Sequence, residues 1–182
     1  CLALAAPAAA AEPTLLETER LSPRLQELTL RTPELAEPTK VRVLLPAGYA
    51  SHPKRRYPVL YLLHGAAGSQ ASWTAQGDAE ALTARLPLIV VMPDGGIGGF
   101  YSDWYNDGTG GLPRWETWHI RGLLPYIDGR YRTVADRSGR ALAGLSMGGF
   151  GAFSYAARHP DLFTAAMSLS GAVDTALVPG VL

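Results

Sequence analysis

The order of hydrophobic and polar residues predicts two strands near the start of the chain. Residues 25–32 (LQELTLRT) and 40–46 (KVRVLLP) switch between apolar and polar at nearly every position, which is typical of strands with one buried face. We expect them to form an antiparallel pair at a sheet edge. The basic segment 52–57 (HPKRRY) that follows is expected to be a solvated turn.

Further along the chain, apolar runs alternate with segments of helical period. The runs at 58–65 and 88–93 predict buried central strands, and further strands are predicted at 140–145 and 163–171. Helices are predicted at 78–87 with Asp78 as N-cap, at 114–131 with a bend near Pro125, and at 147–158, closed by His159 and Pro160. This alternation predicts an α/β fold, a mostly parallel sheet with helices on both faces.

The composition fits one globular domain with a sizeable core. The chain has 182 residues, 47% of them hydrophobic, and its 16 basic residues balance 16 acidic ones. This balance gives no reason to expect a nucleic-acid or anionic-membrane partner. Cys1 is the only cysteine, so the domain has neither a disulfide nor a thiol nucleophile.

Residues 1–13 differ from the rest, since they begin CLALAAPAAAA and carry no charge before Glu12. The segment is typical of the end of a signal peptide with a small-residue cleavage region. A disordered Ala-rich tail and a lipidated Cys1 are the alternatives. The run is too short to cross a membrane as a helix. We therefore expect a secreted protein without stable membrane insertion, whose domain spans 14–182.

The strongest chemical signal is the G-x-S-x-G pattern of residues 144–148, between a predicted strand and a predicted helix. The two glycines permit a sharp turn that lifts Ser146 above the sheet. The N-terminus of the following helix favours developing negative charge. We predict that Ser146 is a nucleophile and that the N–H of Met147 is an oxyanion donor. The alternative is a glycine-rich turn with an incidental serine.

A second loop, HGAAGS at 64–69, follows the predicted strand 58–65. A loop of this kind supplies the other oxyanion amide in serine hydrolases, and we assign that amide to Ala66. His64 and Gly65 are candidates for the substrate pocket. We expect His64 to orient the loop through hydrogen bonds and not to act as a base.

A third loop, MPDGGIGGFYSDWYNDG at 92–108, lies where open α/β sheets bind ligands. Tyr101, Asp103 and Trp104 are candidates for the substrate pocket, the alternative being that they only hold a packed loop. The glycines do not fit the dinucleotide-binding pattern, and no histidine or cysteine cluster has metal-ligand spacing. We expect neither a metal nor a cofactor.

These motifs occur together and in one order: VVMPDGGIGGFYSDWYN, WETW and GLSMGGFGAFSYAARHPDLFTAAMSLSG. Over roughly residues 25–175 the chain resembles the esterase-D and mycolyltransferase (antigen 85-like) family of α/β-hydrolases. The resemblance implies an α/β-hydrolase fold, attack on esters by Ser146, and an oxyanion hole made by the amides of Met147 and Ala66. The HGAAG loop and Gly148-Gly149 are more similar to the general esterases of the family than to its mycolyltransferases.

In this fold the acid and then the histidine of the triad follow the serine along the chain. The only histidine after Ser146 is His159, which lies roughly 20 Å away at about 1.5 Å per helical residue. His159 is therefore not the base, and His52 and His119 belong to no catalytic motif. We expect the acid and histidine beyond Leu182, so that the C-terminal part of the fold is missing here.

The leading hypothesis is a secreted serine esterase that hydrolyses carboxylic esters of small molecules or carbohydrates through an acyl-enzyme on Ser146. A fragment that lacks the acid and the histidine is expected to be inactive on its own. One alternative is an acyltransferase of the mycolyltransferase type. The other is a truncated module that binds without catalysing a reaction.

Overall fold

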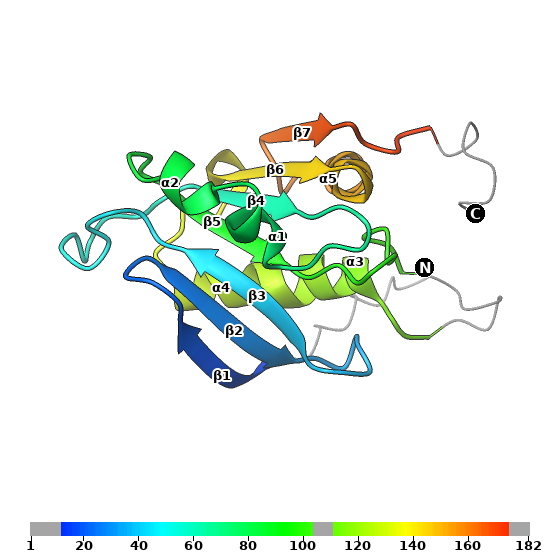
Figure 1. Cartoon of the computed structure of the whole chain (residues 1–182), viewed down its shortest axis with the longest axis horizontal. Coiled ribbons are helices and arrows are strands. Elements are labelled where there is room, and N and C mark those ends of the chain that lie inside the picture. The colour runs from blue at the N-terminus through cyan, green and yellow to red at the C-terminus, as the bar shows by residue number, and fades with distance from the viewer. Residues whose placement is uncertain (1–11, 104–110, 175–182) are drawn as a thin grey trace, which may run out of the picture.

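A seven-stranded sheet forms the centre of the molecule (Figure 1). The structure is a computed structural model and describes residues 12–103 and 111–174. The strand order is β1-β2-β3-β5-β4-β6-β7. The strands are β1 (Thr14–Arg20), β2 (Leu25–Arg31), β3 (Thr39–Leu44), β4 (Val59–Leu63), β5 (Ile89–Pro93), β6 (Arg140–Leu145) and β7 (Ala165–Leu169).

The sheet is antiparallel at one side and parallel at the other. β1, β2, β3 and β5 pair antiparallel, whereas β5, β4, β6 and β7 are parallel to one another. The predicted antiparallel pair 25–32 and 40–46 is confirmed as β2 and β3. It does not lie at the edge, because the unpredicted β1 adds outside it, at the edge opposite β7 (Figure 1).

The helices lie on both faces of the sheet, as predicted. They are α1 (Ser72–Ala75), α2 (Ala79–Leu82), α3 (Trp115–Thr117), α4 (Leu124–Arg130) and α5 (Met147–Arg158), and a short 3-10 turn (Arg137–Gly139) precedes β6. Within residues 12–103 and 111–174, no helix is both long and apolar enough to cross a bilayer.

A π-helical segment, Trp118–Leu123, joins α3 to α4 just before Pro125. Proline has no N–H and its ring crowds the carbonyl four residues earlier, so a regular α-helical turn is disfavoured there. The predicted helix at 114–131 is confirmed, and the irregularity near Pro125 takes the form of this wider turn.

The predicted helix at 78–87 is wrong in its length and in its cap. Only one turn forms, and Asp78 has a left-handed backbone (φ 48°) with no capping hydrogen bond from its side chain. The guanidinium of Arg24 donates to the carbonyls of Glu80 (2.9 Å) and Thr83 (3.2 Å). In a longer helix the Glu80 carbonyl would accept from the N–H of Ala84, which here donates to the Ala81 carbonyl at 3.2 Å. Arg24 from outside the helix satisfies the Glu80 carbonyl instead, and Pro87 has no N–H to offer Thr83.

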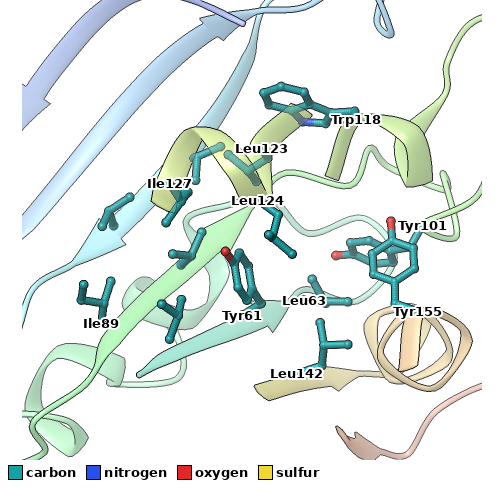
Figure 2. Close-up of a cluster of buried hydrophobic side chains, with 14 of the residues drawn as sticks. Tyr61, Leu63, Ile89, Tyr101, Trp118, Leu123, Leu124, Ile127, Leu142 and Tyr155 are labelled. Carbon is teal, nitrogen blue, oxygen red and sulfur yellow. The ribbon is translucent and has the colours of Figure 1, made fainter. Parts of the chain in front are cut away.

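Two hydrophobic cores fill the space between the sheet and the helices. The larger core lies under the α3–α4 segment and α5, where Trp118, Leu123 and Tyr155 belong to one cluster with Tyr61 and Leu63 (Figure 2). The smaller core lies on the other face, under Trp73 of α1 and Ala79 of α2. Every strand from β4 to β6 is thus buried on both faces, which explains its continuous apolar run.

A buried carboxylate ties α1 to the antiparallel side of the sheet. Glu27 accepts hydrogen bonds from Lys40 (2.6 Å), Arg42 (2.8 Å) and Gln70 (3.2 Å), and Arg42 also donates to Thr74 of α1 (2.5 Å). Burial raises the pKa of Glu27, but the hydrogen bonds from Lys40 and Arg42 outweigh it and lower the pKa to about 2. The segment that follows the HGAAGS loop is therefore anchored through a charged network.

Candidate active site

The structure places Ser146 on a strained turn between β6 and α5. Its backbone has φ 54° and ψ −115°, a conformation that costs an L-residue of order 1–3 kcal/mol and persists only where neighbouring contacts impose it. Its side chain is exposed and caps no helical N–H. Within the described part of the chain its hydroxyl has no hydrogen-bond partner, so it is open to a ligand.

Glycines permit the close contacts that impose this turn. A Cβ on Gly144 would lie 2.0 Å from the carbonyl oxygen of Gly148, and one on Gly148 would lie 2.2 Å from that of Leu63. A Cβ on Gly149 would lie 2.6 Å from Oγ of Ser168 in β7. The first turn of α5 is therefore packed directly against the backbone at the end of β4, which only glycine allows.

The HGAAGS loop lies beside Ser146, as the assignment of an oxyanion amide requires. A Cβ on Gly65 would be 3.5 Å from Cβ of Ser146. Ala66 is exposed, and its N–H donates to no acceptor within the described residues. Ala67 has a left-handed backbone (φ 58°) and donates its N–H to the carbonyl of Ile97 at 2.9 Å. The loop is thus fixed on both sides of Ala66.

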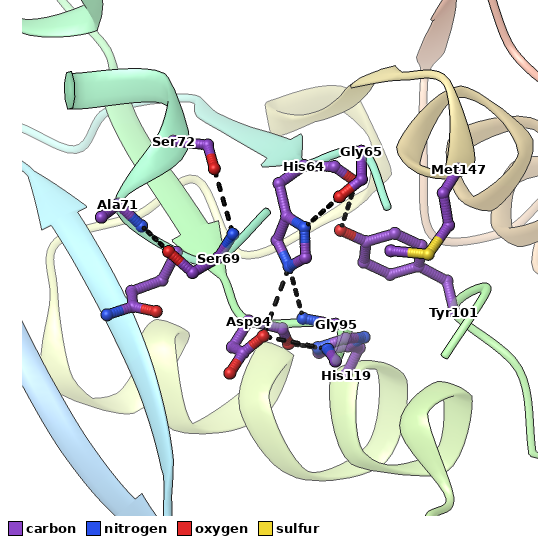
Figure 3. A network of polar contacts seen from close by, with 12 residues as sticks. His64, Gly65, Ser69, Ala71, Ser72, Asp94, Gly95, Tyr101, His119 and Met147 are labelled. Carbon is purple, nitrogen blue, oxygen red and sulfur yellow. Dashed lines mark hydrogen bonds and ion pairs between the residues drawn. The ribbon is translucent and has the colours of Figure 1, made fainter. Parts of the chain in front are cut away.

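His64 is fully buried beneath this loop (Figure 3). The N–H of Gly95 donates to its Nε2 at 2.9 Å, so Nε2 carries a lone pair. Nδ1 faces the carbonyl of Gly65 at 2.7 Å, so Nδ1 carries the proton. Oδ1 of Asp94 lies 3.3 Å from Nε2, but the proton that such a bond needs is on the other nitrogen. His64 therefore orients the loop as a neutral imidazole.

Tyr101 is also buried completely, where a substrate-pocket residue was predicted. Its hydroxyl donates to the carbonyl of His64 at 3.0 Å. Its ring fills the space above Gly95 and Gly151, where a Cβ would approach within 2.5 Å and 2.6 Å of it. The interpretation of His64 and Tyr101 as pocket-lining residues is thus corrected, because both are sealed below the surface and act as supports.

Asp103 holds the start of the α3–α4 segment. Its two carboxylate oxygens accept the backbone N–H of Thr117 (3.0 Å) and the Thr117 hydroxyl (2.5 Å). A carboxylate at a helix N-terminus satisfies free N–H groups and interacts well with the helix dipole. Asp103 therefore has a structural role here. Trp104, predicted beside it, lies outside the described residues.

None of the four histidines is placed to serve as a base for Ser146. His159 follows α5 and pairs with Glu116 at 2.8 Å, and His52 lies in the segment before β4, where it contacts the carbonyl of Gly48 at 2.9 Å. His64 uses both ring nitrogens within its loops. The prediction that His159 is not the base is consistent with this placement.

His119 is a buried residue of the site region that the motifs did not reveal. Its Nδ1 lies 2.8 Å from the Tyr155 hydroxyl and its Nε2 lies 2.9 Å from the carbonyl of Asp94. The rings of Trp115 and Tyr101 pack beside it, with centroids 5.9 and 5.6 Å away. Burial lowers its pKa to about 4, so His119 is neutral at pH 7. Only the tertiary contacts distinguish it from an ordinary helical histidine.

Gly148→Ala should disrupt the turn at Ser146. Its new Cβ meets the Leu63 carbonyl, and backbone atoms cannot move aside cheaply, so we expect a loss of about 3 kcal/mol in unfolding free energy, measured in urea. Gly129→Ala in α4 is the matched control, because nothing lies within 4 Å of its Cβ position. That variant should stabilise the helix by up to about 1 kcal/mol. Equal stability of the two variants would contradict the packing described above.

His119 should make stability depend on pH. Its pKa is about 4 when folded and 6.5 unperturbed, so the unfolded chain binds more protons between these values. Stability should therefore fall by roughly 3 kcal/mol as the pH drops from 6.5 to 4. Glu27 has a pKa of about 2 when folded and 4.5 unperturbed, so protonation of Glu27 lowers stability mainly below pH 4.5. Urea unfolding across this range should show the slope, and His119→Gln should lack it; an unchanged slope would assign it to other groups.

Comparison with known proteins agrees with the fold. The Esterase family model matches residues 32–179. Esterase Rv1288 of Mycobacterium tuberculosis is 44% identical over 159 residues, which are 86% of this chain and 34% of that protein. The diacylglycerol acyltransferase/mycolyltransferase Ag85A of Mycobacterium gordonae is 34% identical over 157 residues, which are 83% of this chain and 44% of that protein.

A solved structure of a ferulic acid esterase superposes with a TM-score of 0.73 and 33% identity, over 81% of this chain and 60% of that one. This chain thus spans about a third of the length of esterase Rv1288. The family match, the sequence relatives and the fold agree with one another. The chain belongs to the Esterase family of α/β-hydrolases.

Proposed function

We propose that this chain carries the nucleophile and the oxyanion hole of a serine esterase that acts on carboxylic esters. The observation that carries the proposal is the turn at Ser146, which exposes a hydroxyl on a strained backbone at the N-terminus of α5. Such strain is maintained at sites where it serves a function. The relatives named esterase and ferulic acid esterase support the same reaction class.

In the proposed reaction, Oγ of Ser146 attacks the ester carbonyl carbon and its proton passes to a general base. The carbonyl oxygen becomes an oxyanion, which accepts hydrogen bonds from the N–H groups of Met147 and Ala66. When the intermediate collapses, the carbon–oxygen bond to the alcohol breaks, the base returns its proton to the departing alcohol oxygen, and an acyl-enzyme remains. Water then attacks the acyl group, and Ser146 is regenerated.

The reaction needs a general base, and none of the four histidines is in position. We propose that the base and its acid come from the part of the fold that these residues do not include, since the chain covers 60% of the ferulic acid esterase structure. A role without catalysis is the alternative. The turn at Ser146 and the Ala66 amide, which has no acceptor among the described residues, favour the enzyme, because a pure binding module needs neither.

We also propose that the protein is secreted, on the basis of the uncharged, Ala-rich residues 1–11. Its substrate is proposed to be an ester of a small molecule or a carbohydrate. Ile97 supports a substrate with an apolar group. Its carbonyl accepts from the N–H of Ala67, which places Ile97 beside the HGAAGS loop, and Ile97 is highly exposed.

Ser146→Ala should abolish ester hydrolysis by the full-length gene product. With p-nitrophenyl acetate as substrate, kcat/KM should fall by at least about 10³-fold, because no other group forms the acyl-enzyme. Ser154→Ala, on the same helix α5, is the matched control and should keep the wild-type rate. Activity retained in Ser146→Ala would refute the assignment of the nucleophile.

Acyl transfer is the second candidate, because a diacylglycerol acyltransferase/mycolyltransferase is 34% identical over most of this chain. The two reactions share the acyl-enzyme and differ in the hydroxyl that resolves it. For a hydrolase, adding glucose to the p-nitrophenyl acetate reaction should leave acetate as the main product. Predominant formation of acetyl-glucose would establish a transferase, and mass spectrometry of the products separates the two results.

A further inference from the structure

His119 and Tyr155 are both buried, and their side chains form a hydrogen bond with each other. His119 faces the carbonyl of Asp94 with its Nε2 (2.9 Å), so Nε2 must carry the proton. In the neutral ring Nδ1 is then an acceptor, and the Tyr155 hydroxyl lies 2.8 Å from it. Burial keeps Tyr155 protonated, since its pKa is raised well above 10.0. The Trp115 carbonyl also lies 3.5 Å from the Tyr155 hydroxyl, but Nδ1 of His119 is much nearer and takes its single proton. Tyr155 therefore donates to His119, and His119 donates to Asp94.

The carbonyl that accepts from His119 belongs to the peptide unit between Asp94 and Gly95. Its carbonyl accepts from His119, and its N–H donates to Nε2 of His64 at 2.9 Å (Figure 3). The two groups of a trans peptide point in opposite directions. The two histidines thus bracket one peptide unit, and each contacts a different end of its dipole.

His64 in turn contacts the peptide unit between Gly65 and Ala66. Nδ1–H of His64 donates to the Gly65 carbonyl at 2.7 Å, and the N–H of Gly68 donates to the same oxygen at 3.1 Å. These two donors fix the plane of the peptide. Its N–H, that of Ala66, points the opposite way and is the amide assigned to the oxyanion.

We propose that these hydrogen bonds form one relay, which begins at the Tyr155 hydroxyl and ends at the Ala66 N–H. Every donor in it points in the same direction, toward the oxyanion. In such a chain each bond polarises the next, so the final N–H is a stronger donor than an isolated amide. His119 and Tyr155 are thus positioning residues that touch no substrate. This assignment rests on the proposed function of the Ala66 amide.

The relay predicts an effect on the chemical step and not on substrate binding. Removal of a whole oxyanion donor costs about 10²–10³ in kcat, so weakening one should cost roughly three- to tenfold. In the full-length gene product, with p-nitrophenyl acetate, Tyr155→Phe should lower kcat by this factor with KM unchanged. His119→Phe, which removes two links, should lower kcat further. His119→Gln restores an N–H donor for the Asp94 carbonyl and should recover most of the rate.

Tyr61→Phe is the matched control. Tyr61 is buried in the same core, and its hydroxyl has no hydrogen-bond partner within the described residues. It should leave kcat unchanged. If Tyr155→Phe and His119→Phe match this control in kcat, or if they change only KM and the unfolding temperature, the two residues are merely structural and the relay is refuted.

A second readout does not depend on catalysis. The ¹⁵N resonance of Ala66, assigned by its loss in Ala66→Gly, should shift upfield in Tyr155→Phe and more in His119→Phe, but not in Tyr61→Phe. An unmoved Ala66 resonance in both relay variants overturns the relay. Should Ser146→Ala retain hydrolysis, the proposed function fails, and the Ala66 resonance still decides whether the relay exists.

Discussion

The contact between the first turn of α5 and the end of β4 is the constraint on which the site depends. Gly148 lies so close to the Leu63 carbonyl that no side chain fits between them. This contact sets where α5 begins and so forces Ser146 into its strained conformation. The same β4 backbone continues into His64 and Gly65, which brings the oxyanion loop beside the serine. One packing contact therefore positions both halves of the site.

Around this contact, buried polar groups hold the loops in place through hydrogen bonds, and glycines allow the loops to pack closely against neighbouring atoms. The 94–103 loop buries the side chain of its own Tyr101. Two consecutive residues of this loop, Phe100 and Tyr101, have positive φ angles of 46° and 53°. The strain is compensated locally, since the Phe100 N–H contacts Sδ of Met147 (3.4 Å) and the Tyr101 hydroxyl is bonded to His64. A partly satisfied network in this position would be costly. The side chains of His64 and His119 each use one ring nitrogen as donor and the other as acceptor, so they satisfy the buried backbone groups without bringing a charge of their own into the core.

Much of the site could be predicted because its signals are local. The strand 140–145 and the helix 147–158 match the structure residue for residue, since the glycines that end one and begin the other are also the chemical motif. The orienting role of His64 is predictable for a similar reason, because His64 is the first residue of the loop that it holds.

The errors and omissions come from contacts between distant segments. Arg24 donates to the Glu80 carbonyl, which a longer helix at 78–87 would bond to the N–H of Ala84. β1 joins the sheet through charged, largely exposed residues without a clear alternation. His119 and Tyr155 are 36 residues apart and carry no motif. Their link to Asp94 exists only after β5, the π-helical segment Trp118–Leu123 and α5 have packed together, so no pattern in the sequence could show it.

The most direct test of the central claim is covalent labelling of the full-length gene product with a fluorophosphonate, followed by peptide mass spectrometry. The reagent reacts with an activated serine and leaves a tetrahedral adduct in the oxyanion hole. The account predicts a single phosphonylated peptide, with the label on Ser146. Label on a different serine, or no label on a protein that hydrolyses esters, would contradict it.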